Sequence, residues 1–91
     1  MANTINCGDL LDKAIERIAP HIPDQYTIDD PMWNENYGFE VNVFDLRTIR
    51  GDYIPVSCFR FCRSQNYTNE EVMQDFEREL EDYINIWREF S

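Results

Sequence analysis

The chain has 91 residues, 43% of them hydrophobic and 14% aromatic, and its 18 acidic residues outnumber 8 basic ones, giving a net charge of −10. This length fits one domain over 1–91, and the apolar content excludes a disordered acidic tail. The charge disfavours nucleic acid and anionic membranes as direct partners, because both would repel the chain at long range. No apolar run approaches the ~20 residues that cross a bilayer.

The N-terminal segment and the cysteines indicate a reducing compartment. The first nineteen residues carry acids early and lack a charged stretch before an apolar one, so they do not resemble a secretory signal. Three cysteines, an odd number, are typical of reducing conditions, and we expect all three to be small core residues. Cys58 and Cys62 lie roughly 13 Å apart along one strand face, too far for a disulfide. We therefore expect a cytoplasmic protein.

The first predicted element is a helix over residues 6–19. Asn6 is a suitable N-cap, and Pro20 disfavours helical conformation in the residue before it. Apolar side chains recur at helical spacing, at Leu11, Ile15, Ile18 and Ile22. Acidic side chains occupy another face, at Asp9, Asp12 and Glu16. Residues 20–36 then mix Pro, Asp and Asn, which predicts a loop, with or without a short strand at 25–28.

The middle of the chain predicts two or three antiparallel strands. Apolar and polar residues alternate over 39–43, and two apolar residues in a row at 43–44 indicate a bulge or a change of buried face. Arg50-Gly51-Asp52 is a turn signal, and residues 53–63 return as a second long strand with Phe59 and Phe61 on one face. Pro55 favours an edge position or an interruption.

The last helix has the strongest signals in the sequence. Thr68 and Glu71 form a capping box, and a heptad-like apolar seam follows at Met73, Phe76, Leu80, Tyr83, Trp87 and Phe90. The predicted fold class is therefore α+β: an N-terminal helix, an antiparallel sheet of two or three strands and a long C-terminal helix, with the helices packed on the sheet.

Carboxylates line two rows of the last helix, away from its apolar seam. One row consists of Glu71, Asp75, Asp82 and Glu89, and the other of Glu70, Glu77 and Glu81. Carboxylates four or seven residues apart are separated by roughly 6 or 10 Å along the axis, whereas two phosphate steps on one DNA strand span about 7 Å. The rows are therefore candidate phosphate substitutes, and a solvated face that keeps the protein in solution is the alternative interpretation.

The C-terminal end of the seam is wider than a small sheet covers. We expect most of the seam to form the core, but we expect Trp87 and Phe90 to remain under-covered in a single chain. A symmetric homodimer through Tyr83, Trp87 and Phe90 would bury this end.

Catalytic and metal signatures are absent from the sequence. Only three glycines occur, no phosphate-cradling loop is present, and no Ser–His or Cys–His pattern is found. The lone His21 and the three cysteines do not match a standard zinc spacing. We expect a protein that is not an enzyme and that holds no cofactor or metal.

In these features the chain resembles the small acidic DNA-mimic inhibitors of bacteriophages, and among them the Arn family of anti-restriction proteins of T-even phages. The two acidic helices and the aromatic seam ending in Trp87 and Phe90 carry the resemblance. It implies a homodimer, charged like a segment of DNA, in the cytoplasm of the host bacterium. The implied partner is a basic DNA-binding protein, either a modification-dependent restriction nuclease of the McrBC type or a histone-like protein such as H-NS.

Other hypotheses remain open on the sequence alone. A phage anti-CRISPR inhibitor of a Cas effector would use the same electrostatic mechanism on a different target. A small adaptor would instead dock the hydrophobic end of its last helix in a partner's groove, with charge serving solubility. A small metal-binding or catalytic protein is the third class.

Overall fold

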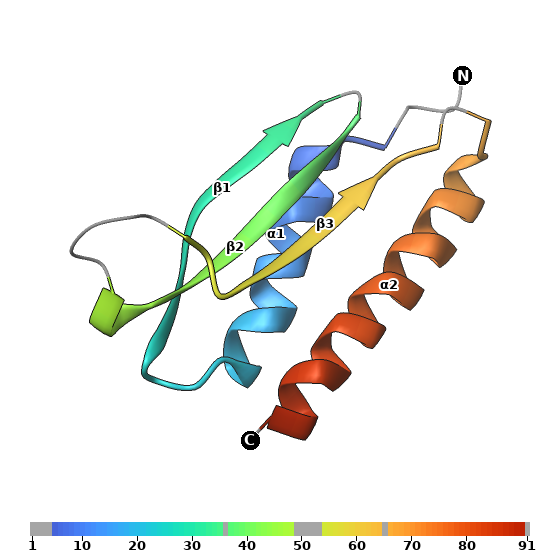
Figure 1. Cartoon of the computed structure of the whole chain (residues 1–91). Helices are drawn as coiled ribbons and strands as arrows, with labels where there is room; N and C mark the ends of the chain where they lie inside the picture. Colours follow the sequence, from blue (N-terminus) through green and yellow to red (C-terminus); the bar gives the residue numbers. More distant parts are fainter. Residues whose placement is uncertain (1–4, 36, 49–53, 65, 91) are drawn as a thin grey trace.

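The computed structural model describes residues 5–35, 37–48, 54–64 and 66–90 and confirms the α+β fold class (Figure 1). The elements are α1 (Cys7–Ile18), the 3-10 turn η1 (Ala19–His21), β1 (Tyr26–Asn34), β2 (Gly38–Asp45), the 3-10 turn η2 (Leu46–Thr48), β3 (Ser57–Cys62) and α2 (Asn69–Phe90). The strands form an antiparallel sheet in the order β1-β2-β3. The predicted turn at 50–52 lies outside the described residues.

Both helices cover the same face of the sheet. Helix α1 packs on β1 and β2, whereas α2 packs on β3 and contacts α1. Figure 1 shows that the two helices run side by side in the same direction. The core lies between the helices and the sheet, and it contains most of the buried apolar residues of both layers. The molecule is therefore a two-layer structure with one face of its sheet left without a helix.

Helix α1 begins and ends within one residue of its predicted bounds. The side chain of Asn6 accepts a hydrogen bond from the backbone N–H of Gly8 at 2.6 Å, as expected of an N-cap. Pro20 stands inside η1, the 3-10 turn that directly follows the last α-helical residue. Helix α1 buries Leu10, Leu11, Ala14 and Ile18 and leaves its acidic face outward.

The prediction of a loop over 20–36 is wrong for residues 29–34, and the short strand considered at 25–28 is the beginning of the nine-residue edge strand β1 (Tyr26–Asn34). Acids and a proline gave this segment the composition of a loop. The register against β2 shifts between Asp29 and Met32, so one extra residue is accommodated there. Pro31 lies at this irregularity, where a residue without an N–H group is tolerated.

The extra residue in β1 also keeps apolar side chains on the helix-covered side of the sheet. Tyr26 and Ile28 pack against the core before the shift. After the shift it is Trp33 that points this way, and its ring lies next to Gly8 at the start of α1. A strand without the shift would have turned Trp33 to the opposite face, because side chains alternate with period two.

Strands β2 and β3 follow the predicted alternation. Phe59 and Phe61 are both buried on the helix-covered side, opposite Val41 and Phe39 of β2. Phe44 is also buried, which confirms the predicted change of buried face at the end of β2. The interruption expected near Pro55 is present, because the edge strand β3 begins two residues after it.

Gly38 opens β2 at a position where only glycine fits. Its φ of 156° lies in a region that side-chain-bearing residues avoid. A Cβ at this position would lie 2.0 Å from the carbonyl oxygen of Phe61. The close approach allows β2 to pair from its first residue with Cys62, the last residue of the antiparallel strand β3.

Helix α2 confirms the capping box. The backbone N–H of Thr68 donates to Glu71 Oε1 at 3.1 Å, and the Glu71 N–H donates to Thr68 Oγ1 at 3.2 Å. The helix then buries Val72, Phe76, Leu80, Tyr83, Ile84 and Trp87. Among the described residues, no helix has both the length and the apolar character that a membrane span requires.

The three cysteines are free thiols, but they do not all lie in the core. Cys7 is buried, Cys58 is half-buried and Cys62 is exposed, so the prediction of three core residues is wrong for Cys62. The reason is the alternation of β3, which places Cys58, Arg60 and Cys62 on the sheet face that has no helix. Burial and then the neighbouring Glu40 raise the pKa of the Cys58 thiol to about 11.

Candidate functional site

The helical layer carries most of the negative charge of the molecule. Helices α1 and α2 together contain eleven acidic residues and four basic ones, a net charge of −7 out of the −10 of the whole chain. The helices lie side by side on one face of the sheet (Figure 1). The structure thus places both predicted groups of carboxylates in the same layer of the fold, on two different helices.

The acidic face of α1 points away from the core. Asp9, Asp12 and Glu16 are all exposed, and at about 100° per residue they lie opposite the buried face of this helix. None of the three has an ion pair within the described ranges. This face is available to a partner.

The row of Glu70, Glu77 and Glu81, here the inner row, lies on the side of α2 that faces α1. Arg17 of α1 forms ion pairs with Glu77 and, at 3.1 Å, with Glu81. Arg88 of α2 also pairs with Glu81, at 3.0 Å. These side chains remain roughly half exposed, so each pair stabilises the fold by only about 0.2–1 kcal/mol. Even so, the arginines neutralise two of the three carboxylates of the inner row.

The row of Glu71, Asp75, Asp82 and Glu89, here the outer row, lies on the opposite side of α2. Glu71 is held by the capping box, and Asp75 pairs with Arg78 within the helix. Asp82 and Glu89 are exposed and have no ion pair in the part of the chain that the structure describes. The outer row therefore keeps free carboxylates toward its C-terminal end.

Glu79 is a further acidic residue on the outer side that the sequence rows did not include. It lines a shallow hollow together with Cys58, Arg60 and Asp82. Partial burial raises the pKa of the Glu79 carboxyl, and the nearby charge of Asp75 raises it further. On a helical wheel Glu79 lies about 40° from Asp75, so the sequence alone could have assigned it to the outer row. Its proximity to β3, in contrast, depends on the fold.

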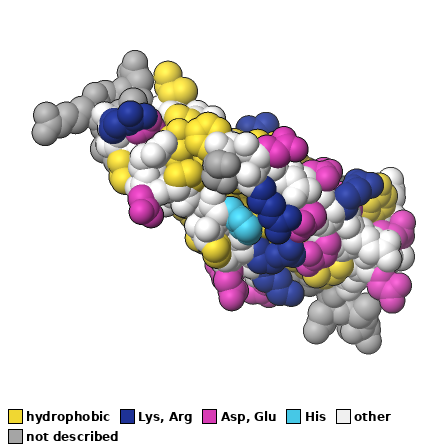
Figure 2. All heavy atoms as spheres, turned by 90° about the horizontal axis from the view of Figure 1, so that it is seen from below, with side chains coloured by type: hydrophobic (Ala, Val, Ile, Leu, Met, Phe, Trp, Pro, Cys, Tyr) yellow, Lys and Arg dark blue, Asp and Glu magenta, His cyan; other side chains and the backbone are white. Residues whose placement is uncertain are grey.

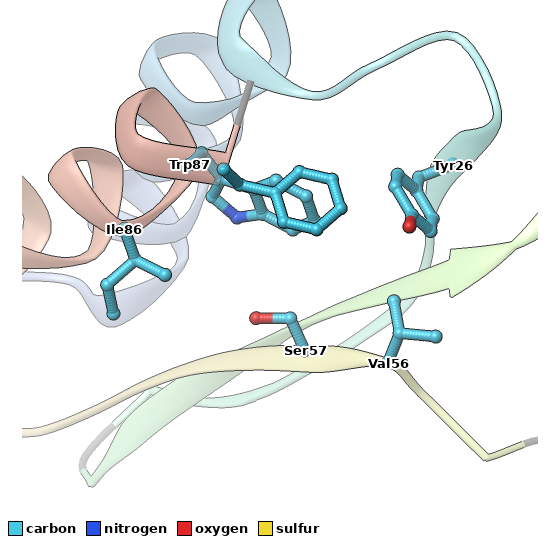
Figure 3. A pocket seen from close by; sticks show the side chains of 6 residues that line it. Tyr26, Val56, Ser57, Ile86 and Trp87 are labelled. Carbon is cyan, nitrogen blue, oxygen red and sulfur yellow. The ribbon is translucent and has the colours of Figure 1, made fainter.

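An apolar pocket lies at the C-terminal end of α2. It has a volume of about 190 Å³ and is lined by Tyr26, Val56, Ser57, Ile86, Trp87 and Phe90. Figure 3 shows the Trp87 ring in the pocket, with Tyr26 to one side, Ile86 to the other and Ser57 and Val56 beneath. The Ser57 hydroxyl lies 2.7 Å from the Tyr83 hydroxyl, so these two polar groups satisfy each other. The sequence did not predict this pocket, because three separate segments build it.

Of the two residues expected to remain under-covered in a single chain, Trp87 and Phe90, the expectation is wrong for Trp87. Tyr83 is 7% exposed and Trp87 is 5% exposed, so a single chain already covers both. Tyr26 provides much of this cover, with its ring centroid 5.5 Å from that of Trp87 and 6.0 Å from that of Phe90. Only Phe90 is left 59% exposed. The prediction of a homodimer through these residues therefore loses most of the apolar area on which it was based.

Basic side chains interrupt the acidic surface at one end of the molecule. Figure 2, seen from below, shows Lys and Arg side chains gathered beside the histidine, with acidic side chains next to them. Arg17 and Arg88 occupy the last turns of α1 and α2. The negative surface is thus formed by the acidic face of α1 and the outer row of α2, here called the flank of the helical layer, and not by this end.

Carboxylates on this flank accept charge-assisted hydrogen bonds from arginine and lysine side chains, and this is the chemistry that the arrangement offers. Within the described residues, no group of three or more His, Cys, Asp or Glu side chains is placed to hold a metal ion. Comparisons with protein-family models, curated proteins and solved structures found no significant match to the chain. Function is therefore inferred from the geometry of these carboxylates.

Proposed function

We propose that this protein is a DNA-mimic inhibitor, which binds a cationic DNA-binding protein through the flank of its helical layer and blocks access of that protein to DNA. The observation that carries the proposal is the net charge of −7 on two adjacent helices, with free carboxylates on α1 and on the outer row of α2. Such a concentration of like charge destabilises a small domain, so a binding role accounts for its presence.

The spacing of charge on α2 supports the comparison with DNA. Its 22 residues span about 33 Å and carry eight acidic side chains, or one carboxylate per ~4 Å of helix axis. A single DNA strand carries one phosphate per ~3.4 Å. After its two arginines are subtracted, α2 keeps six net negative charges, or one per ~5.5 Å, so a DNA-binding groove would meet somewhat more than half of the linear charge density of a DNA strand.

Three classes of target share this chemistry. The resemblance to phage anti-restriction proteins motivates a McrBC-type restriction nuclease or an H-NS-like histone-like protein, and a Cas effector has a similar basic channel. All three bind DNA through lysine and arginine side chains that displace the counterions condensed on the phosphates, and the same side chains would pair with the carboxylates of an acidic protein surface. The proposal is for this class of partner and for a site on α1 and α2.

Competition with DNA tests the proposal. The protein is immobilised, exposed to bacterial lysate at low salt, and washed with duplex DNA or with increasing salt. We expect the captured protein to be a DNA-binding protein that duplex DNA displaces and that moderate salt releases. A captured protein that stays bound in the presence of excess duplex DNA would contradict mimicry.

A protein-protein adaptor is the second candidate, and the apolar pocket beside Ile86 and Phe90 favours it. Docking of an apolar segment in this pocket would depend little on ionic strength, whereas electrostatic mimicry weakens steeply as salt screens the charges. The same salt series therefore distinguishes the two functions. Retention of the partner at ~1 M salt would support the adaptor.

A further inference from the structure

The apolar pocket and the acidic outer side of α2 form one continuous surface. Ile86 lines the pocket and also lines the hollow that contains Glu79 and Asp82. Asp82 precedes Ile86 by four residues, which places its carboxylate about 6 Å away along the helix axis. Phe90 also lines the pocket. A ligand that enters the pocket therefore has the carboxylates of Asp82 and Glu79 on its Ile86 side.

The pocket also contains an unsatisfied hydrogen-bond donor. Trp87 is 5% exposed, and its indole Nε1 has no hydrogen-bond partner among the described residues. A buried donor without an acceptor is unfavourable, so such groups in native structures mark places where a partner is missing. Ile86 and Phe90 beside it are 60% and 59% exposed, so their side chains have space to rotate and admit an acceptor.

We propose that this pocket binds a basic polypeptide segment of the partner, one that carries a bulky apolar side chain between lysine or arginine residues. The apolar side chain fills the pocket, a backbone carbonyl of the segment accepts a hydrogen bond from Trp87 Nε1, and the flanking basic side chains pair with Asp82 and Glu79. This inference rests on the proposed function, and it adds a specific contact to the general attraction between opposite charges.

The charges around the pocket decide between a basic segment and a second copy of this chain. A second copy carries a net charge of −10 and would bring its own Asp82 and Glu89 close to the same residues of its partner across a two-fold axis. Repulsion at that distance opposes the dimer, whereas a basic segment removes the repulsion that already exists along α2. At protein interfaces a few residues supply most of the affinity, and they do so by burying an apolar side chain in a pocket rimmed by polar groups.

Three synthetic peptides and the 15N-labelled protein test the inference. The first peptide is Lys-Arg-Leu-Arg-Lys, the second replaces Leu by Ser, and the third keeps Leu but replaces the basic residues by Gln. NMR follows the indole N–H signals of Trp87 and Trp33, which the variant Trp33→Phe assigns. We expect the first peptide to shift the Trp87 signal and to bind about tenfold more tightly than the second, because only its leucine is removed from water.

Two surface variants link the effect to the pocket. Ile86→Ser should abolish most of the difference between the Leu and Ser peptides, whereas Met32→Ser, on an equally exposed residue of β1, should leave it unchanged. Trp87→Phe keeps an aromatic ring and removes the donor, so it should weaken the Leu peptide about threefold, in line with the loss of one hydrogen bond. Because Ile86 and Met32 are exposed, their variants should fold even if the Trp87 variant does not.

The possible outcomes distinguish failure of the pocket contact from failure of the proposed function. Equal binding of the Leu and Ser peptides, with shifts only along the carboxylate rows, would overturn the pocket contact and leave electrostatic mimicry intact. Equal binding of the basic and Gln peptides would overturn the role of Asp82 and Glu79. A concentration-dependent dimer in sedimentation that Phe90→Ser converts to monomer would show that a second copy occupies the pocket and would overturn the inference.

Discussion

The inner and outer carboxylate rows of α2 have similar helical spacings, yet their surroundings differ. The inner row faces α1, and Arg17 of α1 together with Arg88 of α2 neutralises Glu77 and Glu81. The outer row faces away from α1 and keeps Asp82 and Glu89 free within the described chain. The comparison teaches that a row of acids on a helix keeps its negative charge where no arginine of a neighbouring turn or helix reaches it. The inner row holds the two helices together, and the outer row is available to a partner.

The largest expected effect comes from neutralising the two rows separately. The outer-row variant combines Asp75→Asn, Asp82→Asn and Glu89→Gln, and the inner-row variant combines Glu70→Gln, Glu77→Gln and Glu81→Gln. Both remove three negative charges. At about 0.5 kcal/mol per surface pair, the outer-row variant should bind the captured partner roughly tenfold more weakly in competition with duplex DNA. The inner-row variant should lose at most about threefold, because two of its three carboxylates are already paired.

The same two variants should differ in stability in the opposite direction. The melting temperature of the outer-row variant should hold or rise, since repulsion between like charges is relieved. That of the inner-row variant should fall, because Arg17 loses both of its partners. Equal losses of affinity from the two variants would mean that total charge, and not the outer row, governs binding.

A second, smaller effect is expected from Arg17→Met. Loss of the link between α1 and α2 should lower the free energy of unfolding by about 0.5–1 kcal/mol, which corresponds to a fall of a few °C in melting temperature. Glu77 is then free and Glu81 keeps only Arg88, so affinity for the basic partner should rise about twofold. The control is Arg78→Met, whose arginine pairs with Asp75 inside the same helix. If the control destabilises the protein as much as Arg17→Met does, Arg17 has no special role between the helices.

The smallest effect concerns Glu79 and its response to pH. The pKa of Glu79 is raised by partial burial and by Asp75, so the folded protein binds this proton more tightly than the unfolded chain does. Protonation of Glu79 therefore stabilises the fold as the pH falls through the raised pKa, and this contribution is absent at neutral pH. Glu79→Gln should increase stability at about pH 7 by a few tenths of a kcal/mol. Urea titrations at several pH values should show this gain shrinking on acidification, and a loss of stability at neutral pH would contradict it.

The sequence predicted the elements whose signals are local. The capping box of Thr68 and Glu71, the apolar seam of α2 and the Asn6 cap of α1 all depend on residues within one or two turns, and the structure contains them. Strand β1 was missed because its acids and Pro31 resemble a loop, and only pairing with β2 makes it a strand.

The error in β1 also explains the error at the C-terminal end of α2. Trp87 was predicted to be under-covered because Tyr26, which covers it, was assigned to a loop or a short strand rather than to the edge of the sheet. In the candidate site, too, local features could be predicted from the sequence and features built by distant segments could not. The carboxylate rows follow from helical spacing, whereas their neutralisation by Arg17 and the pocket beside Ile86 arise from contacts between distant segments.

The parallel arrangement of α1 and α2 determines the orientation in which the molecule approaches a charged partner (Figure 1). Because the helices point the same way, their macrodipoles add, and both partially negative ends lie at the same end of the molecule. Arg17 and Arg88 in the last turns offset that charge, so this end does not attract a basic surface strongly. Under the proposed function, the long flank of a body 48 Å in length would guide diffusional encounter, and the chain would meet a DNA-binding groove lengthwise rather than end-on.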